Sequence, residues 1–451
     1  MKGFREQVPQ PGPIRPYEFP RVQRARLGSG LQVVAARHGR MPVATVALVI
    51  DAGAMSEPAG RSGLAHLVAH ALDAGAAGRS GEQLAWDFER LGVELGVEAD
   101  WDALTVFATA PSDRLEPLLA LIADVVRRPE FPDDEILRLR DQQLAEILQR
   151  EKEPRALANE MAARYIFGPD ATYGRPLIGH AAEVLPLTRV DATAFHAARF
   201  RPAGAAVILV GDVEADTAPA LVKRHFGDWT GAQPEPTQLT SPVPAQRTTV
   251  HVVDRTDAVQ SEIRVGHTGV ARRHPDYFAL RVMNTILGGA FTSRLNLNLR
   301  ERNGYTYGAR SAFGFRRETG PFVIQTAVGT EVTAPAVAEI LKEVRAMHKH
   351  GATADEVANA RDYLAGIIPL ELQTTGQLAD RIAELVTYDL PDDYFADYRQ
   401  RILGVTPEAV HAAARQHLRP EALAVVVVGN AREIRAPLEA LGAGPLDVAS
   451  P

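Results

Sequence analysis

The feature that most constrains this chain is an internal repeat. Arg201-Pro202 precedes the apolar run AAVILVGDV, and Arg419-Pro420 precedes the run LAVVVVGNA. The two dipeptides are 218 residues apart, and the same offset separates Gly211 from Gly429, the glycines that follow the apolar residues. Each run is a short β-branched stretch, which predicts a buried strand. A constant offset shared by a dipeptide, a strand and a glycine indicates that one structural unit has been duplicated.

Both copies predict the same order of elements. The strands expected at 31–37 and 248–254 are each followed by a second strand, by Ala- and Leu-rich helices, and by a last helix that leads into the closing strand. Strands separated by blocks of helices predict an α+β fold. We expect two homologous α/β sandwich halves, each a mainly antiparallel sheet with helices on one face.

Proline-rich segments mark the expected boundaries. Five prolines within residues 1–20 exclude a regular helix and predict an extended arm. Residues 231–247 contain four prolines and no sustained apolar period, which is typical of a linker. The expected organisation is an N-terminal half over 21–230, the linker over 231–247, and a C-terminal half over 248–451.

Composition excludes several classes of protein. The chain has 451 residues, a formal net charge of −7 and no cysteine. The charge gives no global attraction for nucleic acid, and the missing thiols exclude disulfides, thiolate metal sites and cysteine nucleophiles. No run of 18 apolar residues predicts a membrane span. No signal peptide is visible at the N-terminus, which favours the cytoplasm, although a trimmed periplasmic chain would look the same.

The segment GLAHLVAH places two histidines on an expected helix. His66 and His70 are one turn apart on one face, a spacing that suits zinc, although such pairs also arise by chance. Zinc needs a third ligand. Glu146 lies 76 residues after His70, in a strongly helical stretch over 132–152. Spacing alone does not identify it as a ligand, because acidic residues on helices usually face solvent.

These segments together resemble a known family. GLAHLVAH, the LAEI around Glu146 and YGRPLIG at 173–179 resemble the insulinase/pitrilysin family of zinc peptidases, whose hallmark is an inverted H-x-x-E-H motif. The stretches RFRPAGAAVILVGDV and LGGAFTSRLNLNLRERNGYTYGARS resemble its later segments. The similarity runs in order over nearly all of residues 22–440. It resembles most a bacterial, mitochondrial-processing-peptidase-like member with a degenerate motif.

The resemblance implies roles for five residues. His66, His70 and Glu146 match the three ligands of one zinc ion in the N-terminal half. Arg300 and Tyr307, seven residues apart in the C-terminal half, match the pair that holds the substrate carbonyl and stabilises the oxyanion. A guanidinium and a phenol are donors suited to that developing charge.

The chain departs from the family at its general base. Ala69 stands where the family has the Glu before the second histidine, and Leu139 stands where a secondary carboxylate is usual. Loss of a positioned acid or base typically costs roughly 10²–10⁴ in rate. Ala69 reflects either natural divergence or an introduced Glu-to-Ala substitution in an active enzyme. Divergence is favoured, because Leu139 and the following ALDAGAAGRS are altered as well.

Three functions remain open from the sequence. The favoured one is a subunit that is inactive alone and supplies Arg300 and Tyr307 to a homologous partner with an intact H-x-x-E-H. The second is a zinc endopeptidase active as a homodimer, and the third is a non-proteolytic peptide-binding or scaffold subunit. Substrates would be unfolded or extended peptides that add as a strand to a sheet edge.

Two further patterns carry weaker expectations. Gly288-Gly289 lacks the Lys-Ser/Thr of a phosphate loop, so we expect a flexible segment there. The run Arg272-Arg273-His274 is short, and we expect it to form a solvated face.

Overall fold

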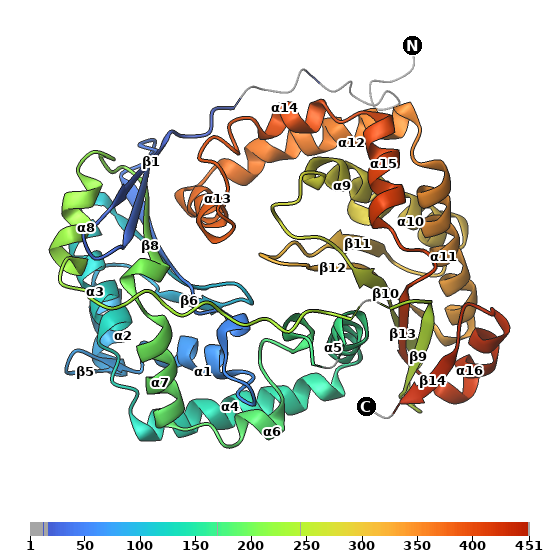
Figure 1. Cartoon of the computed structure of the whole chain (residues 1–451), viewed down its shortest axis with the longest axis horizontal. Helices are drawn as coiled ribbons and strands as arrows, with labels where there is room; N and C mark the ends of the chain where they lie inside the picture. Colours follow the sequence, from blue (N-terminus) through green and yellow to red (C-terminus); the bar gives the residue numbers. More distant parts are fainter. Residues whose placement is uncertain (1–11, 13–16, 169, 244, 450–451) are drawn as a thin grey trace, which may run out of the picture.

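The computed structural model describes residue 12 and residues 17–168, 170–243 and 245–449. Of the arm predicted over 1–20, only residue 12 and residues 17–20 are described, and the rest of that prediction lies outside the described residues. Two six-stranded sheets dominate the fold (Figure 1). The first contains β1 (Val22–Arg26), β2 (Gln32–Arg37), β3 (Val43–Ile50), β6 (Gly96–Ala99), β7 (Leu104–Pro111) and β8 (Ala205–Gly211). The second contains β9 (Thr249–Asp254), β10 (Gln260–Thr268), β11 (Ala309–Phe313), β12 (Pro321–Gly329), β13 (Ala424–Gly429) and β14 (Leu446–Ala449).

The two sheets share one topology in five of their six strands, and the sixth differs, because β1 pairs antiparallel with β2 whereas β14 pairs parallel with β9. The first has the order β1-β2-β8-β3-β7-β6, and the second, read from its other end, has the order β14-β9-β13-β10-β12-β11. The closing strand of each half therefore inserts between the first two strands of the repeated unit. It pairs parallel with β2 or β9 and antiparallel with β3 or β10. The predicted fold class of two duplicated, mainly antiparallel α/β halves is confirmed.

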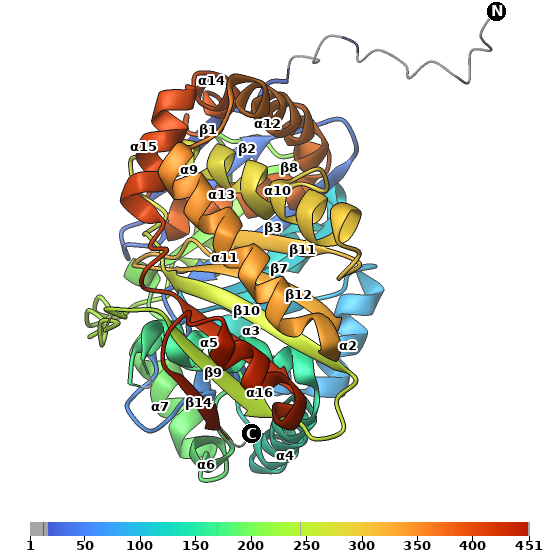
Figure 2. The same cartoon turned by 90° about the vertical axis from the view of Figure 1, so that its right-hand side faces the viewer.

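Helices surround both sheets. The first half contains α1 (Leu64–Ala71), α2 (Gly81–Arg90), α3 (Leu115–Arg127), α4 (Asp133–Lys152), α5 (Pro154–Phe167), α6 (Ala181–Val184), α7 (Arg189–Arg199) and α8 (Ala218–Phe226), with a small hairpin of β4 (Gly75–Ala76) and β5 (Arg79–Ser80). The second half contains α9 (Tyr277–Asn284), α10 (Arg294–Asn296), α11 (Thr333–His350), α12 (Ala354–Ile367), α13 (Thr375–Thr387), α14 (Tyr398–Leu403), α15 (Pro407–His417) and α16 (Ala431–Ala440). In Figure 2, α11 and α16 lie across the face of the second sheet that is turned to the viewer.

A proline separates the two long helices of the first half. Pro154 occupies the first turn of α5, where its missing N–H costs nothing, and Glu153 before it is extended. The chain therefore turns sharply after α4. This turn sends α5 away from its own sheet, while α4 stays beside α1.

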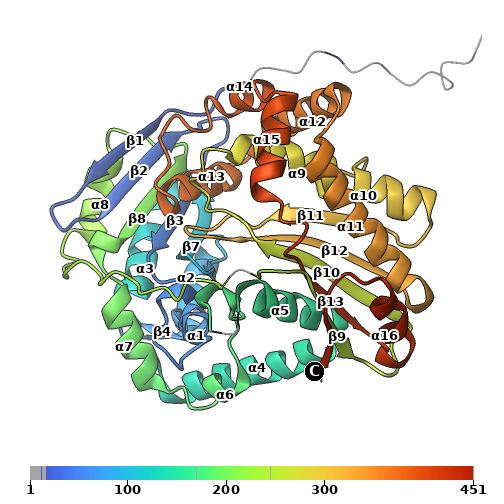
Figure 3. The ribbon, with the colours of Figure 1, turned by 45° about the vertical axis from the view of Figure 1, so that its right-hand side comes forward.

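The halves exchange one helix each. α5 packs on β10 and β13 of the second sheet, and α13 packs on β3 and β8 of the first (Figure 3). Ile208 and Val210 of β8 meet α13, whereas Val207 and Leu209 face the helices of their own half. Both faces of each closing strand are thus buried, which explains why the strands are apolar without alternation.

Polar contacts also join the halves. The guanidinium of Arg317 binds Asp51 at 2.8 Å, and its backbone N–H donates to the carboxylate of Asp102 at 2.9 Å. Thr45 of β3 donates to the hydroxyl of Thr375 at the start of α13, at 2.8 Å. The exchange of helices and these polar contacts fix the orientation of one sheet relative to the other.

Residues 229–243, which are described, form no helix or strand. The domain boundaries given above stay a prediction. Among the described residues, every helix is too short or too polar to meet the length and hydropathy expected of a bilayer-spanning segment.

Candidate functional site

The two motif histidines are the only residues of α1 that are not buried. The helix follows Gly63, whose backbone is left-handed, with a φ of 89°. A Cβ at this glycine would lie 2.5 Å from the carbonyl oxygen of Ile178, so no larger residue fits there without a shift. The apolar residues of α1 pack into the core of the first half, and His66 and His70 project from it.

The imidazoles of His66 and His70 lie side by side, with ring centroids 4.4 Å apart. Burial, together with the positive charges of His70 and Arg150, lowers the pKa of His66 to about 4. His66 is therefore neutral near pH 7, the state in which an imidazole can bind a metal. His70 is exposed and lines an open cavity of about 690 Å3 next to the N-terminal end of α4.

The position of the missing base belongs to the core. The side chain of Ala69 is only 2% exposed and packs in the apolar cluster of the first half. Leu139 on α4 packs against the same cluster. Both positions expected to carry a carboxylate thus present hydrocarbon, and neither can accept a proton.

A buried glutamine holds α4 against α1. The side-chain amide of Gln143 donates to the carbonyl oxygens of Gly63 and Ile178, at 3.0 and 2.7 Å. It therefore ties the start of the histidine helix, α4 and the loop before α6 together. No spacing pattern in the sequence points to Gln143, because its role depends on carbonyl groups of distant loops.

Glu146 lies one turn further along α4 but does not join the histidines. Its side chain is 49% exposed, and Arg150 lies 3.8 Å from its carboxylate. Arg150 also donates to Glu160 of α5 at 3.0 Å. Among the described residues, one group of three His, Asp or Glu side chains has ligand atoms all within 4.8 Å of one another, and it lies elsewhere.

Zinc fits the predicted donor set only in part. Two neutral imidazoles and a carboxylate have the right chemistry for zinc. However, the carboxylate of Glu146 does not lie with the two imidazoles, and the positive charge of Arg150 contributes to the lowered pKa of His66. In the described conformation these side chains do not form a three-ligand set. Zinc at His66, His70 and Glu146 therefore stays a prediction.

The predicted oxyanion pair lies in the other half, next to the edge strand β11. Arg300 is on a π-helical turn over Leu297–Arg302, and its guanidinium stacks on the ring of Phe291 at 4.4 Å. Tyr307 follows this turn, and its side chain is 96% exposed. Tyr307 and Phe291 line a cavity of about 650 Å3 together with Tyr363. The histidine pair on α1 thus lies in one half, and the predicted oxyanion pair next to β11 lies in the other (Figure 1).

Two weaker expectations are wrong in part. Gly288 is buried in a π-helical turn, and a Cβ there would lie 2.5 Å from the hydroxyl of Ser311, so close packing rather than flexibility requires this glycine. Arg273 is exposed as expected, but Arg272 is not part of a solvated face: it is 2% exposed, binds Glu384 and stacks on Tyr277 at 3.8 Å. A charged residue becomes buried when it has such partners, which short-range sequence does not show.

Comparison with known proteins agrees with this architecture. The model described as insulinase (peptidase family M16) matches residues 32–179, and the model described as peptidase M16 inactive domain matches residues 186–364. The chain belongs to the insulinase family, M16. Insulinase-family relatives include an uncharacterized zinc protease of Mycobacterium tuberculosis, 29% identical over 94% of this chain and 96% of the relative.

Other insulinase-family proteins are more distant. The probable beta subunit of the mitochondrial-processing peptidase of Arabidopsis thaliana is 24% identical over 92% of this chain and 80% of the relative. The crystal structure of a peptidase M16 inactive domain from Pseudomonas fluorescens superposes with a TM-score of 0.85 at 27% identity, covering 91% and 98% of the two chains. A protease from Helicobacter pylori shares the fold, with a TM-score of 0.86 at 20% identity over 92% and 100%.

Proposed function

We propose that this chain is an insulinase-family subunit that is catalytically deficient alone and supplies Arg300 and Tyr307 to a zinc site on a homologous partner. The observation that carries the proposal is the contrast between the two halves. The first half has a buried methyl group at Ala69, where the family has its base. The second half presents Tyr307 almost fully to solvent.

The geometry around Tyr307 suits delivery of donors to another molecule. Arg300 is braced by the ring of Phe291, which is itself exposed, and Tyr363 lies on the same cavity. A guanidinium and a phenol held at a surface can donate hydrogen bonds to a substrate carbonyl when a partner covers that surface. An aromatic cluster around an Arg is also typical of a protein–protein contact.

Peptide substrates would bind by strand addition. β6 and β11 are edge strands, each paired on one side only among the described elements. β6 contacts the histidine helix α1, and β11 begins two residues after Tyr307. A peptide added to either edge would therefore pass close to one of the two predicted groups, and backbone pairing accepts many sequences.

The experiment is a reconstitution with a homologous chain that has an intact H-x-x-E-H. We expect the pair, and not this chain alone, to cleave an unstructured peptide in a chelator-sensitive way. Tyr307→Phe or Arg300→Ala in this chain should lower kcat by roughly 10²–10³ and leave KM nearly unchanged. Arg302→Ala is the matched control, because Arg302 is exposed on the same π-helical turn.

Other outcomes of the reconstitution would contradict the proposal or support one of the two other functions. Activity of the pair that survives both substitutions would refute the proposal. Zinc-dependent cleavage by this chain alone would favour the homodimeric endopeptidase. Peptide binding without cleavage, in every combination, would favour the scaffold subunit.

A further inference from the structure

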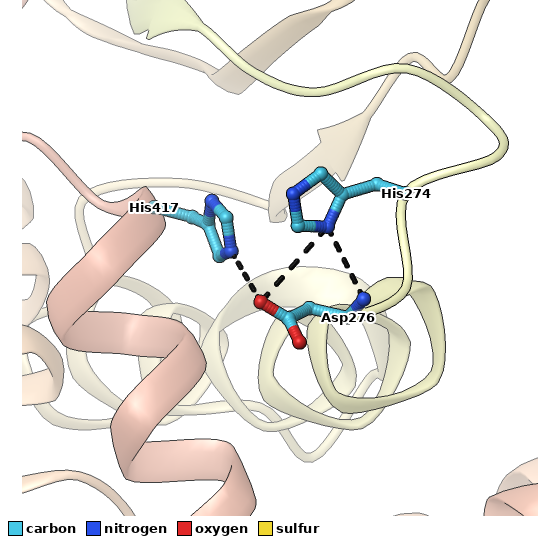
Figure 4. A group of neighbouring side chains, drawn as sticks. All are labelled: His274, Asp276 and His417. Carbon is cyan, nitrogen blue, oxygen red and sulfur yellow. Dashed lines mark hydrogen bonds and ion pairs between the residues drawn. The ribbon is translucent and has the colours of Figure 1, made fainter.

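A second group of possible metal ligands lies far in sequence from the histidine helix α1. His274 and Asp276 lie in the segment between β10 and α9, and His417 is the last residue of α15. α9 and α15 pack against each other and bring the three side chains together (Figure 4). The histidines are 143 residues apart, so no local spacing in the sequence indicates the group.

The ligand atoms are close to the separation that one ion requires. The Nε2 atom of His417 lies 2.7 Å from Oδ2 of Asp276, and the Nδ1 atom of His274 lies 3.9 Å from the same oxygen. All three atoms lie within 4.8 Å of one another. Ligand atoms on a tetrahedral zinc ion are about 3.3–3.6 Å apart, so shifts of less than about 1 Å would bring two of these separations to the bound value.

The hydrogen bonds show what an ion would replace. His274 Nδ1 accepts a hydrogen bond from the backbone N–H of Asp276 at 3.1 Å, so in this conformation the nitrogen carries no proton and its lone pair is held by that N–H (Figure 4). His417 donates from Nε2 to the carboxylate of Asp276. Binding would release that one proton to solvent, and Nδ1 of His274 would exchange its hydrogen bond from the Asp276 N–H for a bond to the ion, which leaves this N–H to a water.

Burial and charge also favour a cation. The side chain of His417 is 7% exposed, whereas His274 and Asp276 are partly open, which leaves a path for an ion and room for a water ligand. Within the described part of the chain, the Asp276 carboxylate contacts the two histidines and forms no ion pair with a Lys or Arg. Its negative charge is thus not already neutralised by a Lys or Arg.

We propose that His274, Asp276 and His417 form a second metal site, specific for a divalent transition ion such as Zn2+. Two imidazoles and one carboxylate select zinc over magnesium or calcium, which prefer oxygen ligands. The ion would fasten the segment before α9 to the end of α15. The role of the ion is therefore to stabilise the C-terminal half, independently of the histidine helix α1.

The test starts from the full chain with His66→Gln and His70→Gln, so that α1 cannot bind zinc. We expect this background to take up one Zn2+ per chain from micromolar solution, as measured by calorimetry and elemental analysis. Co2+ should give a visible absorption band. At 100-fold excess over Kd, the melting temperature should rise by about 3–8 °C.

Variants at the group then locate the ion. His417→Gln keeps a donor for Asp276, and His274→Gln changes a partly exposed residue, so both should fold and both should weaken binding at least tenfold. His411→Gln, on α15 with Nε2 3.2 Å from the carbonyl of Lys349, is the matched control. No uptake by the background, or uptake that both Gln substitutions leave unchanged, would overturn the proposal and leave the group as a hydrogen-bonded tie.

Discussion

Restoring the family's carboxylate at Ala69 would destabilise this chain. Ala69 is 2% exposed and packs in the core of the first half, so the additional methylene and carboxylate of Glu must displace neighbours. Overpacking of a core typically costs about 1–3 kcal/mol. A carboxylate buried without a partner adds a further cost of about 1–3 kcal/mol. We expect Ala69→Glu to lower the free energy of unfolding by about 2–6 kcal/mol.

A matched substitution isolates the contribution of the charge. Ala69→Gln has nearly the same volume and also buries a polar group without a partner, but it carries no charge, so its loss should be smaller than that of Ala69→Glu. Urea unfolding followed by circular dichroism measures both variants against the unaltered chain. The difference between Glu and Gln then reports the cost of the buried charge.

The same variants test the catalytic reasoning. Because Glu146 is not gathered with His66 and His70, Ala69→Glu alone should not produce zinc-dependent cleavage of an unstructured peptide. A variant that is as stable as the original chain and also cleaves in a chelator-sensitive manner would refute this. It would show that the core can accommodate the carboxylate and that His66, His70 and Glu146 come together when zinc binds.

Three further predictions follow from individual contacts. Gln143→Leu removes two buried hydrogen bonds between α4 and its neighbours, and we expect a loss of about 1–3 kcal/mol in urea unfolding. Tyr307→Phe and Arg300→Ala should each change stability by less than about 0.5 kcal/mol, as measured by thermal melting, because Tyr307 is almost fully exposed and Arg300 stacks on an exposed ring. His66 has a folded-state pKa of about 4, below its ordinary 6.5, so the unfolded chain binds the proton first and stability falls as pH drops from 6.5 towards 4. His66→Gln should flatten that part of the pH profile, and an unchanged profile would contradict the assignment.

Much of the fold could be predicted from the sequence, because the periodicity and the repeat are local signals. The strands around 205–211 and 424–429 and the helix with His66 and His70 are all present. The exchange of α5 and α13 was not predicted. α13 is amphipathic, whereas α5 has no clear apolar stripe. The sheet on which each helix packs is decided by chain geometry, for α5 by the turn at Pro154.

The candidate site could be predicted only where spacing determines contact. His66 and His70 meet because one helical turn brings them together. Glu146 is on the expected neighbouring helix, but Arg150 competes for its carboxylate. His274 and His417 were not found, because the packing of α9 and α15 creates their contact and no pattern in the sequence records it.

The exchange of α5 and α13 has a consequence for how this protein could be divided. Either half produced separately would leave a stripe of valine, isoleucine and alanine uncovered on its sheet, and its own exported helix would have nothing to pack on. Scission of the chain between residues 229 and 243 should therefore yield two fragments that are insoluble alone and refold when mixed. A gene encoding this fold could be split there only if both products were always made together.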